Sequence, residues 1–266
     1  MASFRQMTES RELKVGTYVG QFASPGFGRI LKSAGCQFAV VDMEHSGFSF
    51  ETIKDVLGQL HDVGIASVTR PPSQSAHHLA RLCDIGAQGV VPPMLSTVEQ
   101  ARACLDAIKY APEGKRGCAF GIAHDDYNAL VPADALKAGN ARTSFVPLIE
   151  TAEGVKNADA IAAIDGVDCL WIGHTDLSVS LGIPGDYNAA RFKDAVATVM
   201  AAARRHSKSV GRLIGSPEEA ARVYGEGVDF ICYLGDTWLL QKALRDGFEG
   251  IRGAIGDAPI AGGATS

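Results

Sequence analysis

The chain has 266 residues, 46% of them hydrophobic, and a formal net charge of −5 at pH 7. Such a chain can bury a large core, while its acidic balance and the lack of a Lys/Arg-rich block argue against nucleic acid or an anionic membrane as a partner. No apolar stretch approaches the ~20 residues that span a bilayer, and the first residues, MASFRQMTESRELK, form no apolar signal core, so we expect a cytoplasmic protein.

Short apolar runs alternate with longer helical patterns along the chain. The runs are continuously apolar rather than alternating, which predicts strands buried on both faces of a parallel sheet. Strands followed by helices in this rhythm are typical of βα units. We predict eight strands, at residues 15–20, 38–43, 66–69, 89–92, 145–149, 169–172, 210–214 and 230–234.

Several of the intervening helices have recognisable first residues. Capping-box patterns occur at STVE (96–99) and SPEE (216–219), the second with proline at the first helical position. A third helix is expected after Ser49, where apolar residues recur at helical spacing. These residues are Ile53, Val56, Leu57 and Leu60.

Eight strand–helix units in one chain predict an α/β protein with the (β/α)8 TIM-barrel fold rather than an open doubly wound sheet. We expect a single barrel domain over residues 1–257 and a flexible tail over residues 258–266. Neither GxGxxG nor GxxxxGK[ST] occurs, which disfavours nucleotide binding. The connection at residues 111–143 is unusually long, and we expect it on the barrel face that carries active sites.

Two acidic residues follow apolar runs that are typical of buried strands. Glu150 follows FVPLI, and Asp176 lies just past CLWIG. Two carboxylates at strand ends are hard oxygen ligands that leave most of an octahedral shell free, a pattern that suits Mg²⁺ or Mn²⁺. Taken singly, each acid is more often a solvated loop charge or a helix cap. The six cysteines include no CxxC pair, which predicts reduced, buried thiols and disfavours zinc.

Arg70 and His45 also follow predicted strands. A guanidinium fixed at a barrel mouth can stabilise developing oxyanion charge, and a salt bridge to a neighbouring strand-end acid is the equal alternative. His45 is the best candidate for a general base, because imidazole titrates near neutrality. Asp42 and Glu44 are close in sequence, but strand alternation would aim only residues of matching parity inward.

Six blocks of sequence stand out together and in a fixed order: VVDMEHSGFSFETI, the RPP after the third strand, LCDIGAQGVVPPM, APEGKRG, PLIET and WIGHTDLSVSLG. They resemble the HpcH/HpaI aldolase family, the metal-dependent pyruvate aldolases of the phosphoenolpyruvate/pyruvate barrel superfamily. The resemblance covers residues 10–250. It implies a TIM barrel that uses a divalent metal ion, Mg²⁺, Mn²⁺ or Co²⁺.

The resemblance also implies a role for each matched position. Glu150 and Asp176 match the family's metal ligands. His45 matches the catalytic base, and Arg70 matches the arginine that contacts the keto oxygen of pyruvate. Asp84 matches an acid that pairs with the base histidine, in some members from a neighbouring subunit.

Two further implications concern substrate binding and assembly. Gly173 and Thr175 match the turn whose backbone amides receive the pyruvate carboxylate. The family usually forms homohexamers, trimers of dimers in which the last barrel helix is exchanged between partners. Apolar residues at 238–244 give this chain a helix that could be exchanged, or that could pack on its own barrel.

The chain departs from the family pattern around the site. Leu148 stands where the family often has Gln, and His174 replaces a proline beside a metal ligand. The loop GIAHDDY, which contains His124, also differs from the Ala-Arg-Ala pattern usual after the RG pair. These changes affect acceptor specificity more than the chemistry.

The sequence therefore predicts a class II aldolase. It would cleave or form a 4-hydroxy-2-keto acid through a metal-bound enolate, with pyruvate or a close analogue and an aldehyde as products. A second reading keeps the enolate but forms it by decarboxylating oxaloacetate, as in macrophomate synthase. A third is a keto-acid-binding module without turnover, which would need no base.

Overall fold

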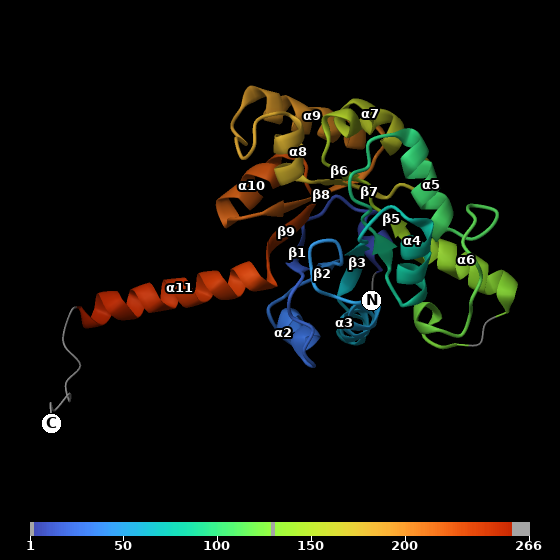
Figure 1. Ribbon diagram of the computed structural model, residues 1–266, viewed down its shortest axis with the longest axis horizontal. Helices are drawn as coiled ribbons and strands as arrows, with labels where there is room; N and C mark the ends of the chain where they lie inside the picture. The colour runs from blue at the N-terminus through green and yellow to red at the C-terminus, as the bar shows by residue number, and fades with distance from the viewer. Residues whose placement is uncertain (1–2, 129–130, 257–266) are drawn as a thin grey trace.

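The computed structural model describes residues 3–128 and 131–256 and shows an α/β protein (Figure 1). Within these residues nine parallel strands form one curled sheet, in the order β5-β4-β3-β2-β1-β9-β8-β7-β6. The predicted tail at 258–266 lies outside the described residues. The strands are β1 (Lys14–Val19), β2 (Phe38–Asp42), β3 (Ala66–Arg70), β4 (Gly89–Val90), β5 (Ser144–Phe145), β6 (Leu148–Ile149), β7 (Cys169–Ile172), β8 (Ser209–Ile214) and β9 (Phe230–Gly235).

All eight predicted strands are present, but the fifth is divided. The prediction of one strand at 145–149 is wrong, because Pro147, which has no N–H group, separates β5 from β6. The peptide groups around it still pair on both sides: the Val146 N–H donates to the β4 carbonyl of Val90 at 3.0 Å, and the Trp171 N–H of β7 donates to the Pro147 carbonyl at 2.9 Å. These bonds link the two ends of the strand order, which is consistent with a TIM-like barrel.

The helices mostly follow the strands and cover the outside of the sheet (Figure 1). They are α1 (Phe4–Met7), α2 (Phe27–Ser33), α3 (Phe50–Val63), α4 (Ala76–Asp84), α5 (Val98–Ile108), the 3-10 helix η1 (Ala123–Asp125), α6 (Pro132–Arg142), α7 (Ala152–Ala162), α8 (His174–Ser180), α9 (Ala190–Arg205), α10 (Pro217–Glu226) and α11 (Asp236–Ile255). Ser49 caps α3 and Ser216 caps α10, as predicted. The remaining predicted cap is shifted by one residue, because Thr97 rather than Ser96 accepts the Gln100 N–H.

The buried core has two layers. An outer layer lies between the sheet and the helices, and it includes the four apolar residues predicted for α3. An inner layer fills the space that the sheet encloses, with side chains from alternate strand positions such as Phe38 and Val40 of β2, and Ala66 and Val68 of β3. Because successive strand residues point to opposite faces, this parity identifies the inward positions of each strand.

The N-terminal helix closes one end of the inner layer. Phe4 of α1 is fully buried, and its ring centroid lies 4.7 Å from that of Phe230 and 6.1 Å from that of Phe38. Phe38 and Phe230 are the first residues of β2 and β9. Helix α1 therefore lies at the end of the sheet where the strands begin, and the opposite end is left for a site.

The long connection lies at the same end as α1, which corrects the prediction that it shares a face with the active site. Helix α5 leads from the end of β4 back along the outside of the sheet. The connection after α5 therefore starts at the end of the sheet where the strands begin. There, Lys109 Nζ donates to the carbonyl of Thr143, the residue before β5, at 2.6 Å. The segment 111–143 also contains η1 and α6, so it is not irregular throughout.

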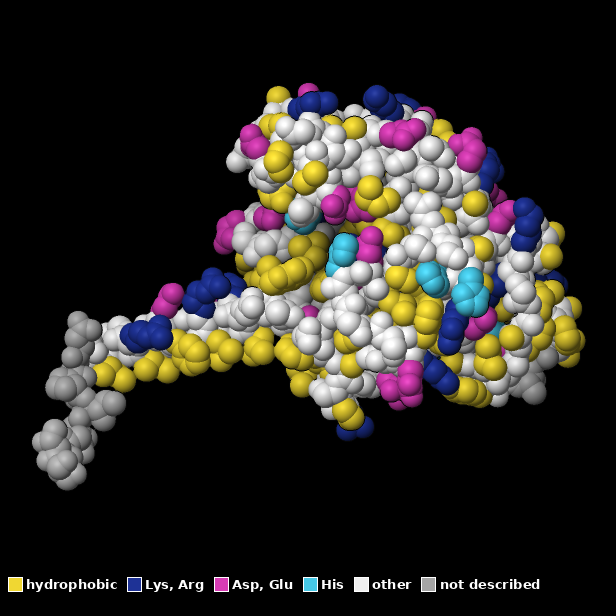
Figure 2. All heavy atoms as spheres, in the orientation of Figure 1, with side chains coloured by type: hydrophobic (Ala, Val, Ile, Leu, Met, Phe, Trp, Pro, Cys, Tyr) yellow, Lys and Arg dark blue, Asp and Glu magenta, His cyan; other side chains and the backbone are white. Residues whose placement is uncertain are grey.

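Helix α11 projects away from the rest of the molecule (Figure 1). Hydrophobic side chains form a row along one side of it (Figure 2). Leu244, Phe248, Ile251 and Ile255 are all exposed. Neither α11 nor any other helix in residues 3–128 and 131–256 has the length and apolar character needed to cross a membrane.

We expect Phe4→Ala to lower the free energy of unfolding by about 3–4 kcal/mol, because it opens a cavity in a closed apolar layer. Phe4→Leu should lose less, because it keeps most of the buried volume. Urea denaturation followed by circular dichroism measures both changes. A Phe4→Ala variant as stable as the wild type would show that α1 does not complete the inner layer.

Candidate active site

Three charged side chains form the last inward layer, at the end of the sheet where the strands finish. Asp42, Arg70 and Glu150 each lie two residues beyond an inner-layer side chain. Strand alternation therefore aims all three toward the barrel interior. Asp42 and Arg70 are also direct neighbours in the register of β2 and β3.

Asp42 and Arg70 form a buried ion pair. Arg70 Nε donates to Asp42 Oδ1 at 2.6 Å, and Asp42 is fully buried. Burial alone would raise the pKa of Asp42, but the hydrogen bond and the charge of Arg70 outweigh it and hold the pKa below its ordinary value. Burial alone would lower the pKa of Arg70, and the Asp42 carboxylate raises it instead. Arg70 is therefore a cation held in place, and Asp42 is the anion that stays paired with it.

The Asp42 carboxylate also organises the turn that follows β2. Its Oδ2 accepts the Tyr18 hydroxyl at 2.5 Å and the His45 N–H at 2.9 Å, and its Oδ1 accepts the Glu44 N–H at 3.1 Å. One carboxylate thus holds the arginine, a tyrosine and the backbone of the turn that carries His45.

Glu44 and His45 extend this network to the surface. Glu44 Oε2 lies 3.2 Å from Arg70 Nη1 and 3.7 Å from His45 Nε2. The His45 side chain is 64% exposed. In Figure 2, acidic and histidine side chains border a hollow near the centre of the molecule's body. The candidate base therefore lies at the mouth of the site, where it is open to a substrate or a second protein surface.

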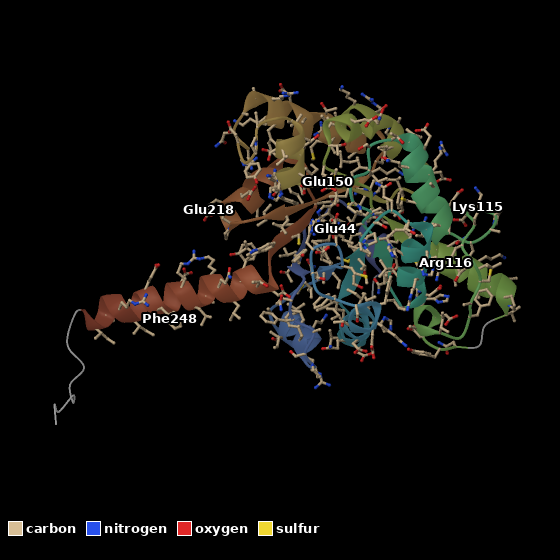
Figure 3. The ribbon with its side chains drawn as sticks, viewed as in Figure 1. Glu44, Lys115, Arg116, Glu150, Glu218 and Phe248 are labelled. Carbon is tan, nitrogen blue, oxygen red and sulfur yellow. The ribbon has the colours of Figure 1, made fainter. Side chains whose placement is uncertain are left out.

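Glu150 is a buried carboxylate of a different kind. It is 3% exposed, and its Oε1 accepts the Met94 N–H at 2.6 Å. Among the described residues no Lys, Arg or His side chain forms an ion pair with it. Burial, with a smaller contribution from the charges of Asp176 and Glu44, raises its pKa to about 7. Figure 3 shows Glu44 and Glu150 in the central part of the molecule.

Gly173 makes room for the Glu150 carboxylate. A Cβ atom at Gly173 would lie 2.5 Å from Glu150 Oε2. The Gly173 N–H donates to the Ile149 carbonyl at 3.1 Å, so this amide already has an acceptor in the sheet. Thr175 and Asp176 follow in the first turn of α8, and both are exposed. The first N–H groups of a helix have no acceptor within it, which leaves the Thr175 amide for a ligand.

The donor set of Glu150 and Asp176 fits a divalent cation. Over residues 3–128 and 131–256, no group of three or more His, Cys, Asp or Glu side chains is arranged to hold a metal ion. Two carboxylates are enough for an ion such as Mg²⁺, which keeps bound waters and takes further oxygens from its substrate. Besides burial, the Asp176 charge raises the pKa of Glu150, so the two acids are close enough to repel each other. A shared cation would remove that repulsion.

Asp84 lies away from the other predicted residues. It is the last residue of α4, and its Oδ1 accepts a hydrogen bond from Arg116 Nη2 at 2.5 Å. In Figure 3, Arg116 lies beside α4 and α6, apart from Glu44 and Glu150. Within one chain, as far as it is described, Asp84 forms no pair with His45. Such a pair therefore requires a second copy of the protein.

The residues that depart from the family pattern lie in different places. Leu148 is buried in the inner layer, next to the Gly173 position. His174 begins α8, and its ring packs against that of Tyr187 with 5.2 Å between centroids. His124 is in η1, at the opposite end of the sheet. Leu148 and His174 are therefore next to the candidate site, and His124 of the same chain is not.

The sequence patterns indicate no role for Asp42, Glu44 or Tyr18. The alternation of inward and outward residues along β2 indicates that Asp42 points inward, because it lies two residues after the inner-layer residue Val40 in the same strand. Glu44 lies two residues further, beyond the end of the strand. Tyr18 gave no signal of its own, because its role depends on the hydroxyl meeting an acid from the neighbouring strand.

Comparison with known proteins gives a consistent set of relatives. A family profile described as "HpcH/HpaI aldolase/citrate lyase" matches residues 17–239. A hydroxypyruvate/pyruvate aldolase from Pseudomonas aeruginosa is 31% identical over 248 residues, which are 91% of this chain and 90% of the relative. A 5-keto-4-deoxy-D-glucarate aldolase from Klebsiella pneumoniae is 28% identical over 249 residues, 92% of this chain and 96% of the relative.

Solved structures give the same fold. The crystal structure of an HpcH/HpaI aldolase from Desulfitobacterium hafniense matches with a TM-score of 0.90 and 26% identity, covering 97% of this chain and 98% of that one. Macrophomate synthase matches with a TM-score of 0.82 and 25% identity, covering 95% of this chain and 90% of that one.

We expect metal-free Glu150→Gln to be more stable than the metal-free wild type at pH 8, by a free energy on the order of 3 kcal/mol. A carboxyl whose pKa is raised in the folded state destabilises that state above its folded pKa, about 7 here. The difference should shrink as the pH falls from about 7 to below the ordinary value of 4.5, where both states are protonated.

Thermal melts of both proteins in EDTA across this pH range test the expectation. Addition of Mg²⁺ at pH 8 should stabilise the wild type and leave Glu150→Gln unchanged. A wild type that is the more stable protein at pH 8 without metal would show that Glu150 carries no uncompensated buried charge.

Proposed function

Because the chain belongs to the HpcH/HpaI aldolase/citrate lyase family, we propose that it is a class II aldolase acting on a 4-hydroxy-2-keto acid. The family and its aldolase relatives make the chain an enzyme, a carbon–carbon lyase. The products of cleavage are pyruvate, or a close analogue such as hydroxypyruvate, and an aldehyde. The observation that carries the proposal is a buried carboxylate without a cation, Glu150, in the same inward layer as a fixed arginine.

Glu150 and Asp176 are the proposed ligands of a divalent cation, Mg²⁺, Mn²⁺ or Co²⁺. When bound, such an ion acts as a Lewis acid that stabilises negative charge on the keto acid. The rest of the ion's coordination shell is left for water and for the substrate. Met94 supports this arrangement, because its N–H fixes Glu150 Oε1.

Arg70 is proposed to stabilise the negative charge that develops on the C2 oxygen of the substrate. Asp42 holds Nε and Glu44 holds Nη1, and in the described part of the chain Nη2 has no hydrogen-bond partner. A charged donor held in place before the reaction needs no reorganisation, and loss of one such donor commonly costs about 3 kcal/mol. The Asp42 pair is therefore the support of the catalytic arginine.

His45 is proposed as the general base that removes the C4 hydroxyl proton in cleavage. Its exposed ring lies at the mouth of the site, with Glu44 as its neighbour. Asp84 is proposed to pair with His45 of an adjacent subunit, because the two residues lie at opposite ends of their own barrel. The Thr175 amide at the start of α8 is proposed to receive the substrate carboxylate, and Gly173 leaves space for the ligand Glu150.

A second candidate activity is the decarboxylation of oxaloacetate, which would use the same arginine and the same proposed metal ion. It is favoured by Leu148, which offers no hydrogen bond to the substrate, and by the structural likeness to macrophomate synthase. Comparing rates on oxaloacetate with rates on a panel of 4-hydroxy-2-keto acids separates the two activities. A keto-acid-binding module without turnover is disfavoured, because the site presents an arginine and a candidate base besides two carboxylates.

We also propose that α11 is exchanged between partners in a homohexamer built as a trimer of dimers. The helix extends from the body with an apolar row exposed along it (Figure 2). Exposed apolar rows of this length mark interaction surfaces. An exchanged helix would complete the barrel of a partner, and the assembly would bring Asp84 of one subunit to another subunit's site.

Glu150→Gln and Asp176→Asn should each reduce Mg²⁺-dependent exchange of the C3 protons of pyruvate by at least about 100-fold, because each removes a ligand charge. Exchange into D₂O followed by NMR measures this step without an aldehyde. Glu153→Gln, an exposed acid three residues from Glu150, is the matched control and should keep wild-type exchange. Full wild-type activity in excess EDTA would exclude the metal-dependent mechanism.

The double variant Leu244→Glu with Phe248→Glu should dissociate the assembly, because it places charges in the apolar row of α11. Light scattering measures the molecular mass of each variant. Glu249→Lys changes a charge on the same helix and should leave the mass unchanged. A wild-type protein with the mass of a single chain at micromolar concentration would refute the exchange.

A further inference from the structure

The first turn of α11 is anchored in the barrel, although the rest of the helix projects from it. Asp236, the first residue of α11, is 6% exposed. Its Oδ2 accepts three backbone N–H groups in the loop after β1, from Gly20 at 3.1 Å and from Gln21 and Phe22 at 2.8 Å each. This carboxylate fixes the start of α11 to the end of β1, next to the candidate site.

Trp238 follows in the same turn and packs on Tyr18 of β1. The two rings are stacked, with 5.5 Å between centroids and an interplanar angle of 27°. Two glycines provide the space: a Cβ at Gly20 would lie 2.6 Å from the Tyr18 ring, and one at Gly235 would lie 2.7 Å from it. The ring of Tyr18 is therefore confined between the ends of β1 and β9 and the indole of Trp238.

The hydroxyl of the confined Tyr18 contacts the carboxylate of Asp42, which supports Arg70. The Tyr18 hydroxyl donates to Asp42 Oδ2 at 2.5 Å, and Asp42 Oδ1 accepts from Arg70 Nε at 2.6 Å. The guanidinium carbon of Arg70 also lies 5.9 Å from the centroid of the Tyr18 ring. Tyr18 thus contacts both members of the ion pair, one through its hydroxyl and one through its ring.

We propose that Trp238 is a positioning residue for Arg70, acting through Tyr18 and Asp42. The inference rests on the proposed function of Arg70 at the C2 oxygen of the substrate. Among the hydrogen bonds, ion pairs and aromatic contacts of the described residues, Trp238 pairs with Tyr18 and with neither Asp42 nor Arg70, so its effect is proposed to pass through the tyrosine. The consequence is that the helix proposed to mediate assembly also sets the geometry of the catalytic arginine.

The physical reason lies in the freedom of the Asp42 carboxylate. With the Tyr18 hydroxyl held in place, Asp42 Oδ2 has a side-chain donor besides the His45 N–H, and Oδ1 faces Arg70 Nε. Without the indole, one face of the Tyr18 ring is open to water, and the phenol can rotate away from Asp42. A carboxylate that has lost this donor turns more freely, and the guanidinium follows it, which weakens a group that must be in place before charge develops.

The test uses the full-length enzyme with Mg²⁺ and pyruvate, and it measures the rate of C3 proton exchange and the KM for pyruvate. Trp238→Ala should reduce the maximal exchange rate about tenfold, with KM and the Mg²⁺ affinity within about twofold of wild type. Trp238→Phe keeps an aromatic face on Tyr18 and should restore most of the rate. If Trp238 were only structural, its loss would lower the amount of active enzyme. In that case Trp238→Leu would restore the rate as well as Trp238→Phe does.

A double-mutant cycle identifies the path. Tyr18→Phe removes only the hydroxyl and should slow exchange to a similar degree. The double variant of Trp238→Ala and Tyr18→Phe should then be no slower than Tyr18→Phe alone, because both changes remove the same support. Effects that multiply in the double variant would show that Trp238 does not act through the tyrosine, and the proposal would be wrong.

Two controls separate this inference from the others. Leu240→Ala, on the same helix and exposed, should keep the wild-type rate, and light scattering on every variant ensures that rates are compared between assemblies of equal mass. If the wild type shows no Mg²⁺-dependent exchange, the proposed function fails. A crystal structure of Trp238→Ala still decides the present inference: Arg70 Nε displaced from Asp42 Oδ1 supports it, and an unchanged 2.6 Å contact overturns it.

Discussion

Two carboxylates buried in the same inward layer differ in one respect, and the rest of the site depends on that difference. Asp42 has its own cation, because Arg70 contacts it at 2.6 Å and holds its pKa below the ordinary value against the effect of burial. Within the part of the chain that the structure describes, the close donor to Glu150 is a backbone N–H, and burial raises the pKa of Glu150 to about 7. A buried acid without a counter-ion is unfavourable in a finished core, and such groups cluster at functional sites, which supports the cation proposed for Glu150.

In the proposed mechanism, this asymmetry divides the positive charge of the site into a permanent part, the guanidinium of Arg70, and an exchangeable part, the metal ion. The guanidinium of Arg70 is fixed by two acids, which suits a group that meets charge only as it develops. The proposed divalent ion on Glu150 and Asp176 would supply charge that can come and go with the substrate, which suits a group that must admit and release a keto acid. The inner layer beneath both is apolar, and Leu148 of that layer lies directly below Glu150, so the charges of the site are confined to the open end of the sheet.

The sequence predicts the strands and the strand-end acids because both depend on local patterns. Continuous apolar runs mark the strands, and parity along a strand would have placed Asp42 inward with Arg70. Position along the chain says less about which end of the sheet a connection lies at, because a helix can carry the chain back to the end where the strands begin. The segment 111–143 follows the fourth strand in sequence, but α5 carries the chain back before it begins. Asp84 was assigned to the site by resemblance, and α4 carries it to the other end of the barrel.

The single chain also shows which parts of the site depend on assembly. The arginine pair, Glu150 and the turn that carries His45 are all built by hydrogen bonds within one barrel. His45 itself is exposed, and Asp84 is paired with Arg116 at the far end of the sheet. In the proposed function, metal binding and charge stabilisation would therefore belong to the subunit, while orientation of the base would belong to an interface. Because α11 is fixed to the end of β1 through Asp236, any partner that holds this helix also acts on the strand that carries Tyr18.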